Sequence, residues 1–177
     1  MGEKWKEKYA EDGFKYEREI QKRWNKLNDK VFSAFESFGF RLPNYWLAYP
    51  VTPWRKVIPF SSPLTFRISK NWNEVFTTLI HELSHVELTY SENQKLSYKI
   101  SCYIQKTFAK EDQTTKIHIP VDLLQISVMA KIFPKKYKKM IKRQKSFSYQ
   151  KRTWEILEEN KKNINLQDPV SSILSLS

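Results

Sequence analysis

The chain is poor in the residues that make tight turns and covalent cross-links. Its 177 residues include three glycines and one cysteine, Cys102, against six tryptophans. A lone cysteine cannot form a disulfide bridge within the chain, so nothing in the sequence indicates an oxidising compartment. The low glycine content and the many aromatic rings predict large elements joined by few tight turns.

Long apolar runs are absent as well. No apolar stretch approaches the roughly 20 residues that a membrane-spanning helix needs. The first six residues, Met1 to Lys6, mix charges and lack the apolar centre of a secretory signal. From these absences we expect a cytoplasmic protein without a membrane span.

What the chain does contain is typical of a folded domain. Apolar residues make up 40% of the sequence and aromatic residues 15%, which is too much for a disordered tail. A length of 177 residues suits one hydrophobic core. We therefore expect a single domain over residues 1–177.

The net charge of +12 is concentrated in one segment. Ten basic residues and no acidic residue lie between Lys131 and Arg152. Such a segment is either a solvated helix face or a patch that attracts nucleic-acid phosphates, anionic membranes or acidic proteins. The seven candidates for contact with a nucleic acid or another anion are Lys135, Lys136, Lys138, Lys139, Lys142, Arg143 and Lys145.

An apolar stripe predicts a first helix over residues 14–38. Apolar side chains recur there at steps of three and four, which places them on one helical face. Gly39 follows directly, where a left-handed helix cap would lie. The members of the stripe are Tyr16, Ile20, Trp24, Leu27, Val31, Phe35 and Phe38.

Residues 42–68 predict a small twisted sheet. Five prolines in this region exclude a helix interior and favour extended segments and turns. Short strands are expected near residues 45–49 and 56–60. The segment Leu64–Ile68 alternates apolar and polar residues, which is typical of a half-buried strand.

Helices are expected after this sheet. Asn71 and Glu74 form a capping-box pattern that opens a helix over residues 72–89. Residues 96–108 fit either a strand or a helix, and we favour the helix. We predict an α+β fold that is mostly helical, in which the small sheet precedes the helix over residues 72–89.

Two further helices complete the prediction. One spans residues 119–133, with His118 at its start and Pro120 in its first turn, where proline is tolerated. The other spans residues 149–160. The serine-rich tail that follows is expected to be frayed.

The motif His-Glu-x-x-His at residues 81–85 lies on the helix predicted over residues 72–89. Residues four apart project from one helical face, so His81 and His85 can bind one zinc ion. Glu82 lies beside His81 and can reach a water on that ion without being a ligand, which makes it the candidate catalytic base. The alternative is a pair of ordinary histidines on a core helix.

A catalytic zinc site needs a third protein ligand. The remaining histidine, His118, lies 33 positions after His85 (118 − 85). The dipole at a helix start favours a neutral imidazole, which suits a ligand. Asp122, one turn beyond His118, is the alternative ligand, or else a group that supports the site by hydrogen bonding. Other acidic candidates are Glu92, Glu111 and Asp112.

A strand, a His-Glu-x-x-His helix and a third ligand on a later helix resemble the zincin metallopeptidases, particularly the very small ones. The chain also resembles small uncharacterised zincin-like proteins of microbes, in which a histidine opens an apolar helix and a tyrosine- and tryptophan-containing segment follows. Their counterparts here are His118 and the segment Tyr149–Ile156. The chain lacks the His-x-x-Gly-x-x-His extension of the metzincins and an evident second glutamate motif of the gluzincins.

This resemblance implies a zinc-dependent peptidase that acts on a protein or peptide substrate. Glu82 would be the general base, and the segment Leu64–Ile68 could pair with the substrate backbone. The candidates for a transition-state hydrogen-bond donor are Tyr90, Tyr98 and Tyr103. Two other functions remain open. One is a nucleic-acid-associated protein, including a DNA-tethered protease, that uses the basic segment 131–152; the other is a zinc-stabilised domain without turnover.

Overall fold

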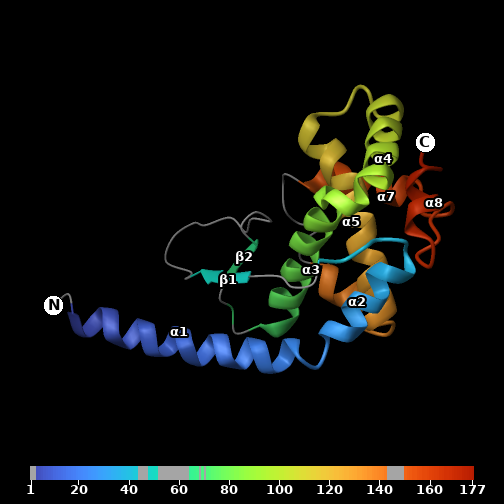
Figure 1. Cartoon of the computed structure of the whole chain (residues 1–177). Coiled ribbons are helices and arrows are strands. Elements are labelled where there is room, and N and C mark those ends of the chain that lie inside the picture. The colour runs from blue at the N-terminus through green and yellow to red at the C-terminus, as the bar shows by residue number, and fades with distance from the viewer. Residues whose placement is uncertain (1–2, 44–47, 52–63, 68, 70, 143–149) are drawn as a thin grey trace.

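The computed structural model describes residues 3–43, 48–51, 64–67, 69, 71–142 and 150–177, and over these residues the chain is mostly helical (Figure 1). Its helices are α1 (Glu3–Trp24), α2 (Asn28–Ser37), α3 (Trp72–Thr89), α4 (Gln94–Thr107), α5 (Gln113–Ile132), α6 (Tyr137–Ile141), α7 (Lys151–Glu159) and α8 (Pro169–Ile173). A short 3₁₀ turn, η1, spans Ser91–Asn93, and the strands are β1 (Ala48–Val51) and β2 (Leu64–Arg67). None of the described helices is long and apolar enough to cross a membrane.

α5 is the centre of the helical body, whereas α1 extends away from it (Figure 1). α5 packs against α2, α3, α7 and α8. Its side chains are therefore buried around most of its circumference, as for Leu123, Leu124, Val128 and Met129. α4 and α7 confirm the helices predicted over residues 96–108 and 149–160, with starts that differ by two residues.

The single helix predicted over residues 14–38 is two helices. The backbone N–H groups of Lys26 and Leu27 bond to the carbonyls three residues back, at 3.2 and 2.8 Å. Bonds of this kind form a tighter turn than the α-helix, so α1 ends here. Asn25 and Asn28 flank this turn, and asparagine side chains compete with helical backbone bonds. The stripe nevertheless reaches the core, where its buried members are Ile20, Val31, Phe35 and Phe38.

Gly39 ends α2 as predicted. Its φ is +88°, a conformation that glycine adopts without steric cost. Its N–H bonds to the Glu36 carbonyl at 2.9 Å, and the N–H of Phe40 bonds to the Phe35 carbonyl at 3.2 Å, which is the Schellman pattern. The rings of Phe35 and Phe40 meet edge to face with centroids 6.5 Å apart, so an apolar contact closes the cap.

The sheet is smaller than the α+β prediction implied. β1 and β2 pair in parallel, with Ala48 opposite Leu64. The strand predicted at residues 45–49 overlaps β1, and the one at 56–60 lies outside the described residues. Pro50 is tolerated in β1 because each strand of a two-stranded sheet keeps an open edge. The described chain is thus a helical fold with one strand pair, and β2 packs against α3.

α3 begins and ends as predicted. Asn71 Oδ1 accepts the N–H of Asn73 at 3.1 Å, which caps the helix start. Asn71 Nδ2 donates to Glu74 Oε1 at 3.0 Å, so the two residues of the predicted capping box meet through their side chains. Tyr16 of α1 stacks on Trp72 with centroids 5.5 Å apart, which ties α1 to the start of α3.

α5 begins six residues earlier than predicted (119 − 113). Asp112 caps it, because its two carboxylate oxygens accept the N–H and the hydroxyl of Thr115, each at 2.8 Å. Pro120 therefore lies inside the helix instead of in its first turn, and His118 lies in the second turn instead of at the start. Because proline has no N–H, the carbonyl of Lys116 receives no helical hydrogen bond from residue 120.

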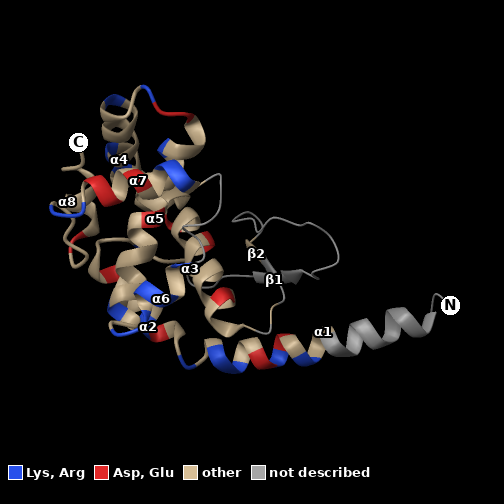
Figure 2. Ribbon diagram, turned by 180° about the vertical axis from the view of Figure 1, so that it is seen from behind, with Lys and Arg blue, Asp and Glu red and all other residues tan. Residues whose placement is uncertain are grey.

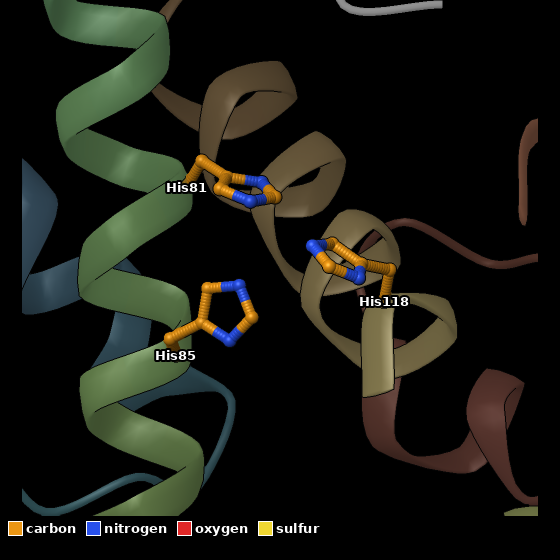
Figure 3. A group of neighbouring side chains, drawn as sticks. All are labelled: His81, His85 and His118. Carbon is orange, nitrogen blue, oxygen red and sulfur yellow. The ribbon is translucent and has the colours of Figure 1, made fainter. Parts of the chain in front are cut away.

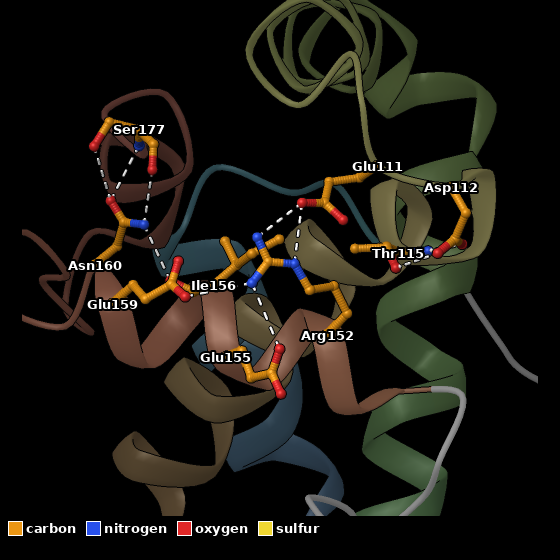
Figure 4. A network of polar contacts seen from close by, with 9 residues as sticks. All are labelled: Glu111, Asp112, Thr115, Arg152, Glu155, Ile156, Glu159, Asn160 and Ser177. Atoms are coloured by element: carbon orange, nitrogen blue, oxygen red, sulfur yellow. Dashed lines mark hydrogen bonds and ion pairs between the residues drawn. The ribbon is translucent and has the colours of Figure 1, made fainter.

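The serine-rich tail is packed, so the prediction of a frayed end is wrong. Ile173 and Leu176 are buried. Asn160 Nδ2 donates to the Ser177 carbonyl at 3.0 Å (Figure 4). The Tyr103 hydroxyl donates to the Leu176 carbonyl at 2.8 Å. The apolar residues spaced among the serines hold this segment on the core.

Asn93 joins the end of α3 to the chain that follows α2. Its Nδ2 lies 3.0 Å from the carbonyls of Arg41 and Glu87 and 3.1 Å from Glu87 Oε2, and its Oδ1 accepts the Arg41 N–H at 2.7 Å. We expect Asn93→Ala to lower the free energy of unfolding by about 2–3 kcal/mol, because buried backbone groups lose their partners. Urea unfolding measures this change.

The matched control is Asn163→Ala, since Asn163 is exposed. Its free energy of unfolding should change by less than about 0.5 kcal/mol. Equal unfolding midpoints for the two variants would show that Asn93 does not support the end of α3.

Candidate metal centre

α3 presents His81 and His85 on one face. The two rings are a helical turn apart, with centroids separated by 4.9 Å and planes nearly perpendicular. The opposite side of α3 buries Val75, Leu79 and Leu83 in the core. Because that side is fixed by packing, the histidine face is held toward α5, against which α3 packs.

His118 of α5 completes a cluster of three histidines (Figure 3). Its ring stacks on that of His81 with centroids 5.5 Å apart and meets that of His85 edge-on at 5.1 Å. One ring nitrogen from each histidine lies within 4.8 Å of the other two. Two ligands of one zinc ion at bonds of about 2.1 Å are about 3.4 Å apart, so a modest inward rotation of the rings brings these atoms to ligand spacing. The cluster could therefore hold one metal ion.

The ring orientation of His118 suits a ligand. Its Nδ1 lies 2.8 Å from the Thr114 carbonyl, so Nδ1 carries the hydrogen and donates it. The lone pair is then on Nε2. Burial lowers the pKa of His118, while the contact with Thr114 acts in the opposite direction, so the ring is neutral near pH 7.

His81 is held from behind by two acceptors. Its Nδ1 lies 3.2 Å from Asp122 Oδ1 and 3.3 Å from Gln125 Oε1. Gln125 is fixed in turn, because its Nε2 donates to the Thr77 carbonyl at 2.7 Å. A hydrogen on Nδ1 leaves Nε2 as the free nitrogen, and a carboxylate behind the ring is typical of histidines that bind metals. Asp122, predicted as an alternative ligand or a group that supports the site, thus lies behind His81 of α3, although in sequence it is one turn beyond His118.

The surroundings of the rings determine how readily each takes a proton. Burial and the neighbouring rings of His81 and His118 lower the pKa of His85 to about 3. Burial also disfavours a charge on His81, but the contacts with Asp122 and Glu82 outweigh it, and the pKa of His81 is raised. Near neutral pH, His85 is therefore a ready ligand, whereas a proton competes with a metal for His81.

Glu82 is buried, with 7% of its surface exposed. Burial raises the pKa of its carboxyl group, and the charge of His81 acts in the opposite direction. A carboxylate whose pKa is raised is better suited to accept a proton. The group of described residues whose ligand atoms converge consists of His81, His85 and His118 and does not include Glu82.

Comparison with protein-family models, with curated proteins and with solved structures found no match. The functional assignment therefore depends on the cluster of His81, His85 and His118 and on the groups around it.

The other acidic candidates for a ligand have partners elsewhere. Glu92 Oε2 lies 3.5 Å from a guanidinium nitrogen of Arg41. Glu111 Oε1 accepts from Arg152 Nη2 at 2.8 Å, and Asp112 caps α5 (Figure 4). These contacts leave His118 as the third member of the cluster.

None of the three candidate tyrosines has a described contact with the histidines. The Tyr103 hydroxyl is bonded to the Leu176 carbonyl, Tyr98 is 71% exposed, and Tyr90 is the carboxy-terminal cap of α3. Gln150, which the sequence analysis passed over, is instead close to the cluster: its Nε2 lies 3.5 Å from His81 Nε2. Its only sequence signal is its place beside Tyr149 in the segment Tyr149–Ile156.

An apolar pocket borders His85. It has a volume of about 210 Å³ and lies between α3, α4 and α5. Leu88, Ile100, Ile104 and Pro120 contribute to its lining. This size suits one aliphatic or aromatic side chain better than a drug-sized ligand.

The described lysines of the basic segment that precede residue 143 lie on α6 or close to it in the chain (Figure 2). The exposed lysines of this segment include Lys135, Lys136, Lys138, Lys139 and Lys142. Arg143 and Lys145 lie outside the described residues. Arg152 is engaged, because its guanidinium lies 2.8 Å from Glu111 Oε1 and 3.3 Å from Glu159 Oε1 (Figure 4). The lysines near α6 remain open to an anionic partner, whereas the charge of Arg152 is balanced within the fold.

Proposed function

We propose that the protein is a zinc-dependent peptidase of the zincin type. The observation that carries this proposal is the convergence of His81, His85 and His118 next to a buried Glu82. Structural zinc sites are usually closed by four protein ligands, whereas catalytic sites use three and keep a position for water or substrate. Three histidines with an adjacent carboxylate fit the second kind of site.

The donor atoms support zinc as the metal. Imidazole nitrogens suit zinc, copper, iron and nickel, and they disfavour magnesium and calcium, which take oxygen ligands. Zinc is bound by three histidines in known catalytic sites, and the carboxylate of Asp122 behind His81 is the usual support for such a ligand.

The surrounding residues suit peptide hydrolysis. Zinc, when bound, would polarise the scissile carbonyl and lower the pKa of its coordinated water. Glu82 takes a proton from the attacking water and delivers it to the leaving amine. Asp122 and Gln125 hold the His81 ring so that Nε2 faces the cluster.

Two features support a peptide as the substrate. The pocket beside His85 can receive one apolar side chain. Among the described strands, β2 pairs only with β1, so its other edge can pair with an extended backbone. Since β2 packs against α3, such a peptide would lie near the histidine helix.

The two other functions are less well supported. The exposed lysines around α6 favour a nucleic-acid partner, but a charge run by itself does not specify one. A zinc-stabilised domain without turnover would have no need for Glu82, because a structural site needs no general base.

Metal analysis together with a cleavage assay tests the proposal. Purified protein should retain about one zinc per chain after dialysis against a weak chelator. It should also cleave casein or a mixed-peptide library, lose this activity with a strong chelator and regain it with added zinc. Folded protein that holds almost no zinc would contradict the metal site, whereas zinc-loaded protein that cleaves nothing would favour the structural domain.

A further inference from the structure

Gln150 is a buried polar residue at the histidine cluster that the mechanism above does not use. It directly precedes α7, and 1% of its surface is exposed. Its Nε2 lies 3.5 Å from His81 Nε2, a contact between residues that are 69 positions apart. The chain therefore brings a third segment, besides α3 and α5, to the same point.

The position of this amide relative to a metal follows from the geometry of His81. Nε2 is the free nitrogen of that ring, because Nδ1 faces Asp122 and Gln125. An atom that shares a tetrahedral ion with this nitrogen lies about 3.4 Å from it, at bonds of about 2.1 Å. The amide of Gln150 is 3.5 Å from this nitrogen, which is the distance expected of a second ligand of the same ion or of a group directly beside one.

The chemistry of the amide decides between these two places. An amide nitrogen carries two hydrogens and accepts nothing, so the atom that faces His81 can donate but cannot bind a metal. Among the described residues, no group donates to Gln150 Oε1. A buried amide that is only partly satisfied needs an explanation other than packing, and a ligand supplied from outside the chain is one.

We propose that Gln150 is the hydrogen-bond donor that stabilises the transition state, a role that rests on the peptidase function proposed above. As the water oxygen bonds to the carbonyl carbon, negative charge develops on the carbonyl oxygen, and Gln150 Nε2–H donates to that oxygen. The C–N bond then breaks, and the proton taken up by Glu82 passes to the amine. Gln150 itself neither gains nor loses a proton.

The test uses Gln150→Leu, which keeps the size of the side chain and removes the donor. Apo protein is titrated with Co²⁺, and the Co²⁺ form is then titrated with acetohydroxamate, both followed by visible absorption. The Co²⁺ dissociation constant should stay within about threefold of wild type, while acetohydroxamate binds about 10–100-fold more weakly, as expected for a lost hydrogen bond to a charged oxygen. In the zinc form, kcat should fall about 10²–10³-fold.

Two further variants make the result decisive. Gln150→Glu keeps an oxygen but has no donor at neutral pH, so it should behave like Gln150→Leu. Thr153→Ala, which alters a fully buried residue one turn later on α7, should bind both probes as wild type does. Loss of Co²⁺ affinity in Gln150→Leu that Gln150→Glu restores would overturn the proposal and make Gln150 a ligand. Acetohydroxamate binding by Gln150→Leu that equals that of wild type would overturn the proposal as well. Because this measurement follows binding and not turnover, it can be made even if the wild type cleaves no peptide.

Discussion

Glu82→Gln should lower the rate of peptide hydrolysis by about 10²–10⁴-fold and leave zinc content and fold unchanged. Glutamine has nearly the same shape as glutamate, but it cannot accept the proton from the attacking water. Glu82 is not one of the three residues whose ligand atoms converge, so its substitution should not weaken metal binding. Zinc analysis and cleavage of a mixed-peptide library, measured on the same preparations, test both halves of this prediction.

Glu87 provides a matched control on the same helix. It is also a buried glutamate, and burial raises its pKa to about 8, but its carboxylate contacts Asn93 instead of the histidines. Glu87→Gln keeps an oxygen that can accept from Asn93 and should therefore retain full activity. A Glu82→Gln variant that is as active as Glu87→Gln would remove Glu82 from the mechanism.

His118→Ala should weaken zinc binding about as much as His81→Ala, by about 10²–10³-fold or more. The reason is that three ligands share a binding free energy on the order of 10 kcal/mol. Asp122→Ala should have a smaller effect of roughly 10–100-fold, because Asp122 contacts His81 Nδ1 and acts through that ring. Competition with a chromophoric chelator measures both affinities.

The order of the two effects is the decisive result. Asp122 is fully buried in α5, so circular dichroism of each variant must first show that the helices are intact. If Asp122→Ala strips the metal from folded protein while His118→Ala retains it, the carboxylate is the ligand and the histidine is not.

Local patterns in the sequence predicted the elements whose ends are set by nearby residues. The start of α3 was predicted because Asn71 and Glu74 form a capping pattern within one turn, and their side chains contact each other. Gly39 was correctly placed for the same reason. The start of α5 was predicted too late although its signal is also local. Asp112 caps the helix by contacting Thr115 within one turn, whereas Pro120 lies inside the helix and does not mark its start.

Contacts between distant segments could not be predicted in this way. The meeting of His118 with His81 and His85 was inferred because no other histidine was left, and the structure brings the three rings together. Gln150 could not be found by such counting, because glutamine is a common residue and its contact with His81 spans 69 positions. The place of Asp122 behind His81 likewise depends on how α5 lies against α3, which no spacing within one helix reveals.

A metal ion bound at the histidine cluster would also couple the stability of the fold to the supply of metal. Its members come from α3 and α5, and the chain between them forms α4, so an unfolded chain has no preformed site. An ion that binds only the native state at 100 times its dissociation constant adds about 2.7 kcal/mol to the free energy of unfolding. In a chain with one cysteine, and hence no internal disulfide, occupancy by the ion would set how often α3 and α5 separate. Metal scarcity would then expose the protein to degradation in addition to any loss of activity.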